Sequence, residues 1–214
     1  MDQKQIGERL LQLLDHSRPE VCVSAAWGLK ELAKPELIEP MFEAAKRFSG
    51  EAAQVSAEAA RVKTAAAISS HLLEALGLMD HQPAEEYLRI FIPKSAPYPE
   101  EARTAAIWAL GYLWADSASL DPKLVRQLEE RLADWISPSP ELYMVSAMSA
   151  VSLGRMKSEA SLPELRRWCS GEGRNTYLGG CCGWAIQQIT GETLPEPKAS
   201  SRQLPGWFLE PLGD

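Results

Sequence analysis

Histidine and cysteine can bind metals or act on substrates, and this 214-residue chain contains three histidines and four cysteines. His16 follows an apolar helical run, His71 lies inside another, and His81 opens a loop that contains proline. Their neighbours do not show the ligand spacing typical of a zinc site. The sequence therefore predicts no metal site and no cofactor, and it favours a packed or partly exposed position for His71.

The cysteines also favour a structural role. Cys181 and Cys182 are adjacent, and they could approach Cys169 across the last pair of helices. Unpaired cysteine is usually a small buried hydrophobic residue, and the repeat described below requires a small residue at Cys182. Four cysteines do not make a disulfide scaffold in a chain of this length, and residues 1–15 lack a secretory signal pattern. We therefore expect a reducing, cytoplasmic setting.

The charge balance narrows the classes of partner. The chain has 22 lysines and arginines against 29 aspartates and glutamates, a net charge of −7, and its basic residues form no continuous stripe. Nucleic-acid backbones are bound mainly by clustered basic groups that displace counterions, so the balance argues against a nucleic-acid partner. No stretch approaches the ~18 consecutive apolar residues of a membrane helix, so we expect no membrane partner either.

The elements that must position any site follow from one recurring pattern. Five apolar runs share the register apolar-basic-x-x-small-small-x-small-Leu-Gly-x-Leu, and residues 102–113 are its clearest copy. The seventh position falls at residues 27, 68, 108, 151 and 184, so successive copies are 41, 40, 43 and 33 residues apart. A period near 40 residues has room for two helices.

The residue pattern predicts a helix in each apolar run and another helix between successive runs. Apolar residues recur at i, i+3, i+4 and i+7 within the runs, and second stripes with the same spacing lie between them. Asp121 and Pro122 have the types of a helix cap and a first helical residue. No stretch alternates like a strand, so the sequence predicts an all-α fold. Because glycine costs about 1 kcal/mol inside a helix, we expect close helix crossings at the glycines of the runs: Gly28, Gly111, Gly154 and Gly183.

The runs resemble the HEAT-repeat family, in the short variant found in phycobilin-lyase-type repeats. The resemblance rests on Ala102-Arg103…Ala109-Leu110-Gly111, on Val62-Lys63…Ala66-Ala67 and on Val145…Leu153-Gly154, and it covers about residues 2–191. The basic second position is lost in three units and the Leu-Gly pair in two. The resemblance implies an α-solenoid of about five two-helix repeats over residues 1–191. The resemblance points to a fold but not to one function, because such repeats serve many roles.

The remaining segment, residues 192–214, is rich in proline and cannot continue the helices. We expect this C-terminal tail to be extended and to cap the last repeat, because a terminal repeat would otherwise expose its apolar side. The apolar triad Trp207-Phe208-Leu209 would then cover that side. A short linear motif for a partner is the alternative interpretation of the tail.

A helical wheel of the third run points to one unusual surface. With Ala106 at the centre of the core side, Trp108 and Tyr112 point the opposite way, where a solvated helix should be polar. The equivalents of Trp108 in the other runs are Trp27, Ile68, Val151 and Trp184. The equivalents of Tyr112 are Glu31, Leu72, Arg155 and Gln188. The first position is thus apolar in all five runs.

Two interpretations of this surface remain open. In one, neighbouring inner helices tilt until these side chains pack together and fill a tightly curved inner side. In the other, aromatic residues line an open concave face and anchor a peptide or a partner helix, as aromatic residues do in many interfaces. The candidate partner-binding residues are Trp27, Trp108, Tyr112, Arg155 and Trp184.

The sequence therefore favours a non-catalytic protein-interaction scaffold that is monomeric or weakly self-associating and contacts its partner through the inner-helix face. The HEAT-like resemblance also implies an enzymatic alternative, because related folds include DNA glycosylases and bilin lyases. The nearest glycosylase-like assembly is Trp108, Tyr112, Trp114 and Asp116. The acidic balance argues against that alternative, and no tetrapyrrole-specific signature is present.

Overall fold

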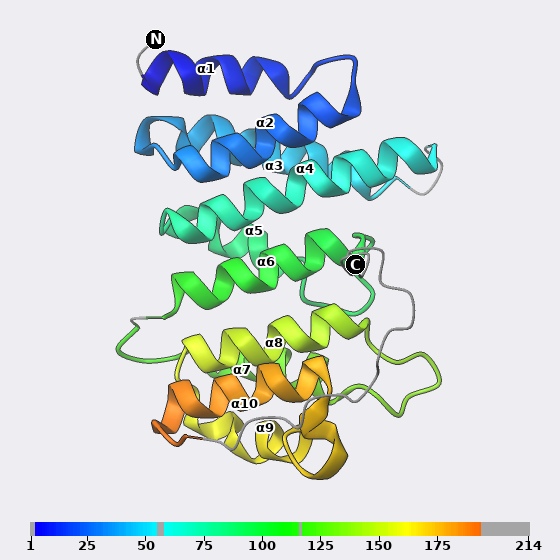
Figure 1. Ribbon diagram of the computed structural model, residues 1–214, viewed down its shortest axis with the longest axis vertical. Coiled ribbons are helices and arrows are strands. Elements are labelled where there is room, and N and C mark those ends of the chain that lie inside the picture. The colour runs from blue at the N-terminus through cyan, green and yellow to red at the C-terminus, as the bar shows by residue number, and fades with distance from the viewer. Residues whose placement is uncertain (1–2, 55–57, 116, 194–214) are drawn as a thin grey trace, which may run out of the picture.

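The computed structural model describes residues 3–54, 58–115 and 117–193. These residues form ten α-helices and four short 3-10 helices and contain no strand, which confirms the predicted all-α class (Figure 1). No helix in the described ranges is long and apolar enough to cross a membrane. The α-helices are α1 (Gln3–Leu13), α2 (Pro19–Leu32), α3 (Ile38–Ala52), α4 (Ala59–Leu78), α5 (Glu85–Arg89), α6 (Glu100–Leu113), α7 (Pro122–Ala133), α8 (Tyr143–Arg155), α9 (Leu162–Trp168) and α10 (Tyr177–Thr190).

The helices lie in two layers. α2, α4, α6, α8 and α10 pack against one another in chain order and form a continuous row, and α1, α3, α5, α7 and α9 each pack on the next helix of that row (Figure 1). The five predicted runs are the row, and the stripes between them are the second layer. Asp121 caps α7 as predicted, since its side chain accepts a hydrogen bond from the backbone N–H of Lys123. The predicted capping tail falls almost wholly outside the described residues.

Glycine residues allow the helices of the row to approach closely. A Cβ atom on Gly111 would lie 2.9 Å from the Cα of Ser152, and one on Gly154 would lie 2.6 Å from the Cα of Ala185. Both crossings were predicted, whereas the crossing at Gly77, where a Cβ would lie 2.6 Å from the Cα of Ala109, was not. Gly28 was wrongly assigned to a tight crossing, because it faces only the end of the Leu10 side chain at 3.3 Å. For Gly183 the crossing stays a prediction.

The same glycines correct the register of the second run. Gly77, Gly111 and Gly154 each contact the next helix of the row, so the residues three positions earlier, Glu74, Trp108 and Val151, are equivalent. The assignment of Ile68 to this position was wrong, because Ile68 is only 1% exposed and lies in the core. The paired Leu72 is fully buried as well. The 20-residue helix α4 is long enough for the alanine-rich repeat pattern to be aligned with it in two ways. The sequence-based alignment used the one nearer its N-terminus.

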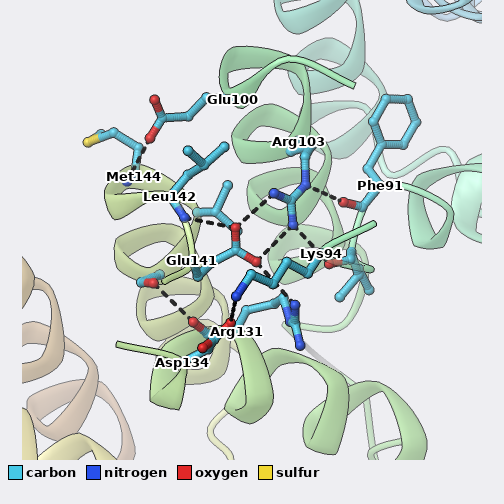
Figure 2. Close-up of polar contacts among 12 residues, drawn as sticks. Phe91, Lys94, Glu100, Arg103, Arg131, Asp134, Glu141, Leu142 and Met144 are labelled. Carbon is cyan, nitrogen blue, oxygen red and sulfur yellow. Dashed lines mark hydrogen bonds and ion pairs between the residues drawn. The ribbon is translucent and has the colours of Figure 1, made fainter. Parts of the chain in front are cut away.

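A buried ion pair ties α6 to the loop that leads into α8 (Figure 2). The guanidinium of Arg103 donates to both carboxylate oxygens of Glu141, over 2.8 and 3.0 Å, and the two side chains are 3% and 1% exposed. Arg103 also donates to the carbonyl oxygens of Phe91 and Ile92 at 3.0 and 3.2 Å. One side chain therefore connects α6, the segment after α5 and the start of α8.

Glu141 is held in its charged form by its neighbours. Burial by itself would raise the pKa of Glu141, but hydrogen bonds from Arg103 and the Leu142 backbone N–H, with the charges of Arg103 and Arg131, lower the pKa below its usual value. Arg131 approaches from α7, with 3.2 Å between its Nη1 and the carboxylate. The network thus sets the position of α6 and α8, the two helices that carry most of the candidate site.

Candidate functional site

Arg155, the last residue of α8, lies among three aromatic rings from two neighbouring helices. Its guanidinium carbon is 4.1 Å from the ring centre of Tyr112, 4.7 Å from that of Trp108 and 5.8 Å from that of Trp184. Trp108 and Tyr112 lie one turn apart on α6, with ring centres 4.3 Å apart, and Trp184 belongs to α10. We call Trp108, Tyr112, Arg155 and Trp184 the arginine–aromatic cluster.

The close backbone crossings explain why these side chains meet. Gly111 and Gly154 let α6, α8 and α10 approach so closely that residues at matching positions on neighbouring helices come into contact. Arg155 follows Gly154 directly, as Tyr112 follows Gly111, so the two side chains leave equivalent points of adjacent helices. The repeat that builds the row therefore also builds the cluster.

The charge of Arg155 is not neutralised by any carboxylate among the described residues. Its Nη1 atom is shielded from solvent and has no hydrogen-bond partner in this part of the chain. Burial lowers the pKa of the Arg155 guanidinium, and the neighbouring Tyr112 hydroxyl partly opposes that effect. Arginine keeps its charge under all ordinary conditions, and a shielded donor without an acceptor costs about 1–3 kcal/mol. Among the described residues, the site thus holds a cation whose close partners are three rings and the Tyr112 hydroxyl, with no carboxylate.

The cluster combines features of both sequence interpretations. Trp108 and Tyr112 are half-buried, with their rings in contact at a tilt of 47° and with Arg155 over both rings, as the packed interpretation required. Trp184 keeps 37% of its surface exposed, and Val151, one turn before Arg155 on α8, is half-buried, so one side of the cluster faces outward. A ligand that reached this side would meet an indole face next to a guanidinium.

Four of the five predicted partner-binding residues come together, and Trp27 does not join them. Trp27 is 53% exposed on α2, and α4 lies between α2 and α6 in the row (Figure 1). At the equivalent position of α4 stands Glu74, which accepts a hydrogen bond from Lys30 at 3.0 Å. The expectation of an apolar residue at this position in all five runs was therefore wrong, and the apolar surface is interrupted at α4.

An open cleft of about 680 Å³ begins beside the cluster, at Tyr112. Trp114 also lines it, and the indole Nε1 of Trp114 is shielded without a hydrogen-bond partner among the described residues. Asp80 and Glu85 bring carboxylates to the same cleft. Of the predicted glycosylase-like assembly, Tyr112 and Trp114 thus share a cleft, Trp108 belongs to the cluster, and Asp116 lies outside the described residues.

Two of the histidines and all four cysteines occupy packed positions, whereas His16 is exposed and accepts a hydrogen bond from the backbone N–H of Arg18. His71 is half-buried, with its Nδ1 3.9 Å from a Glu74 carboxylate oxygen. His81, expected in a loop, is only 6% exposed and packs edge-on against Phe42. All four cysteines are buried free thiols, and burial raises the pKa of Cys181. Within the described ranges no three His, Cys, Asp or Glu side chains are placed to hold a metal ion.

A scan against protein-family models found no match to this chain, and a search of curated proteins found none either.

Proposed function

We propose that the chain is a HEAT-like α-solenoid that serves as a non-catalytic protein-interaction scaffold, with the arginine–aromatic cluster as its contact surface for a peptide segment of a partner protein. The two-layer order of the helices supports the solenoid, because each helix pair covers its apolar stripe only with neighbouring pairs. We further propose that it acts in the cytoplasm, a setting with which its four free thiols agree.

One observation carries the proposal: an exposed tryptophan lies next to an arginine that has no acidic partner among the described residues. Tryptophan, tyrosine and arginine are the residues that most often dominate binding energies at interfaces. The cluster also contains no nucleophile paired with a base, which an enzymatic site of the common types would need. Recognition is therefore the activity that this chemistry supports best.

The enzymatic alternative, a glycosylase-like or bilin lyase-like protein, would use the neighbouring cleft. The described residues that line that cleft include two carboxylates, Asp80 and Glu85, and no lysine or arginine. Arg89 approaches Trp114, with its guanidinium 5.8 Å from the ring centre, but it is paired with Glu85 and Asp121. Such a lining repels a phosphate backbone, so the cleft favours the scaffold over a DNA-directed enzyme.

Selection of short random peptides displayed on phage, with the full chain as target, tests the proposal. Trp184→Ala serves as the counter-target. Trp135→Ala is the matched control, because Trp135 is 47% exposed but lies beyond the end of α7 and packs edge-on against Trp168. We expect the selected peptides to bind the wild type and the Trp135→Ala variant, and to lose binding to the Trp184→Ala variant. If no peptide depends on Trp184, the cluster is not a contact surface and the proposal fails.

A further inference from the structure

We infer that the partner segment presents a carboxylate, from aspartate or glutamate, to Arg155, and that an apolar side chain next to this carboxylate packs on Trp184. The inference rests on the proposed function and adds the chemistry of the partner.

The other shielded cations of the chain show what Arg155 lacks. Among the described residues, Lys30, Arg89, Arg103 and Arg131 have side chains that are 17%, 21%, 3% and 13% exposed, and each lies within 3.2 Å of a carboxylate oxygen, from Glu74, Asp121, Glu141 and Glu141 respectively. Arg155 is also half-buried, yet rings surround it and no ion pair joins it to the described residues. A carboxylate from outside would complete at Arg155 the arrangement that this fold uses elsewhere.

Ring stacking prepares the guanidinium for such a partner. The N–H donors of arginine lie in the plane of the group, so rings over its face leave the donor edge without an acceptor. Nη1 is shielded from solvent, so a partner's carboxylate reaches that atom only if Arg155 or its neighbours shift. A carboxylate can accept two parallel hydrogen bonds from that edge. Contact with Trp108, Tyr112 and Trp184 also limits the motion of the side chain, which reduces the entropy lost on binding. Exclusion of water around the half-buried pair then strengthens the attraction.

A carboxylate fits better than a phosphate. Phosphate sites commonly gather several cations or the N-terminus of a helix. Among the described residues, Arg155 is the one cation that lies over these three rings, and it stands at the C-terminal end of α8. The net charge of −7 further repels polyanions. Trp184 and Val151 offer apolar surface beside the cation, which suits an acidic residue with an apolar neighbour.

The test uses the peptides obtained in the selection that depends on Trp184. Each aspartate or glutamate is replaced by asparagine or glutamine, and affinities are measured by calorimetry for the wild type, Arg155→Met, Arg155→Lys and the control Arg126→Met, an exposed arginine of α7. We expect loss of one carboxylate to weaken binding to the wild type and the control at least about tenfold. The same change should alter binding to Arg155→Met less than about twofold, and Arg155→Lys should lie between.

The outcomes separate the two proposals. If Trp184-dependent peptides bind equally well without their carboxylates, the inference is wrong and the scaffold surface stands. If a phosphoserine at the same position binds more tightly and still requires Arg155, the anion is a phosphate and the carboxylate assignment is wrong. If selection yields no Trp184-dependent peptide, both proposals fall. Circular dichroism of each Arg155 variant shows whether it remains folded. If Arg155→Met does not fold, the comparison between Arg155→Lys and the wild type still decides the test.

Discussion

Replacing Glu141 by glutamine removes the negative charge from the ion pair in Figure 2. The positive charge of Arg103 then stays buried without the opposite charge of Glu141. The Arg103 side chain is 3% exposed, so water cannot compensate for the loss. Removing one partner of such a buried pair costs about 3–5 kcal/mol of the free energy of unfolding. The carbonyl oxygens of Phe91 and Ile92 still accept from Arg103, so we expect a value near the lower end of that range.

Urea denaturation at pH 7, followed by circular dichroism, measures this loss. In a chain of this size 1 kcal/mol corresponds to about 2–4 °C in Tm, so the Glu141→Gln variant should melt roughly 6–12 °C below the wild type. Asp15→Asn is the control, because its partner Arg47 and its own side chain are 45% and 61% exposed. Such an exposed pair contributes about 1 kcal/mol or less.

A double-mutant cycle with Arg103→Met completes the experiment. If the two residues act as a pair, the double variant should be destabilised by clearly less than the sum of the single variants. Additive losses, or a loss for Glu141→Gln no larger than that of the control, would refute the reasoning.

Three further predictions follow from named contacts. Because the pKa of Glu141 is lowered in the folded state, its carboxylate stabilises the fold fully above the ordinary pKa of 4.5, and this stabilisation disappears as pH falls through the lower folded value. The free energy of unfolding should therefore fall less steeply with decreasing pH for Glu141→Gln than for the wild type. Gly154→Ala should lose about 1–3 kcal/mol through its clash with the Cα of Ala185, while Gly180→Ala, which meets no atom within 4 Å, should gain about 0.5–1 kcal/mol in the same urea assay. Arg155→Met should change the free energy of unfolding by no more than about 1 kcal/mol, because lost ring contacts are offset by removal of an unpaired shielded charge; a loss of several kcal/mol in thermal melts would show that Arg155 is a structural residue.

The helices could be predicted from the sequence because their signals are local. Apolar spacing located the helices of both layers, and Asp121 marked the start of α7. The small residues also indicated the crossings at Gly111 and Gly154. Local spacing did not resolve the phase of α4, where an alanine-rich start resembles that of α6 and the contact residue is Gly77.

Contacts between distant residues were beyond this kind of reasoning. Arg103 was assigned a repeat position, but its partner Glu141 lies 38 residues away in an irregular segment with no periodic signal. The helical wheel predicted which face of its helix carries Arg155. Its contacts with the rings of Tyr112 on α6 and Trp184 on α10 depend on how closely the backbones of α6, α8 and α10 approach one another. Trp27 has the same register as Trp108 but is separated from the cluster by α4, where the incorrect phase predicted the apolar Ile68 at the position that Glu74 occupies.

The central claim is that the exposed side of the arginine–aromatic cluster serves recognition and not packing. Measuring the free energy of unfolding and the affinity for a selected peptide on Trp184→Ala and Trp135→Ala tests it most directly. We predict that both variants unfold within about 1–2 kcal/mol of the wild type, as expected for half-exposed rings, and that only Trp184→Ala loses at least about tenfold in affinity. A loss of about 3–5 kcal/mol for Trp184→Ala, the size typical of a buried core residue, together with unchanged affinity, would contradict the account.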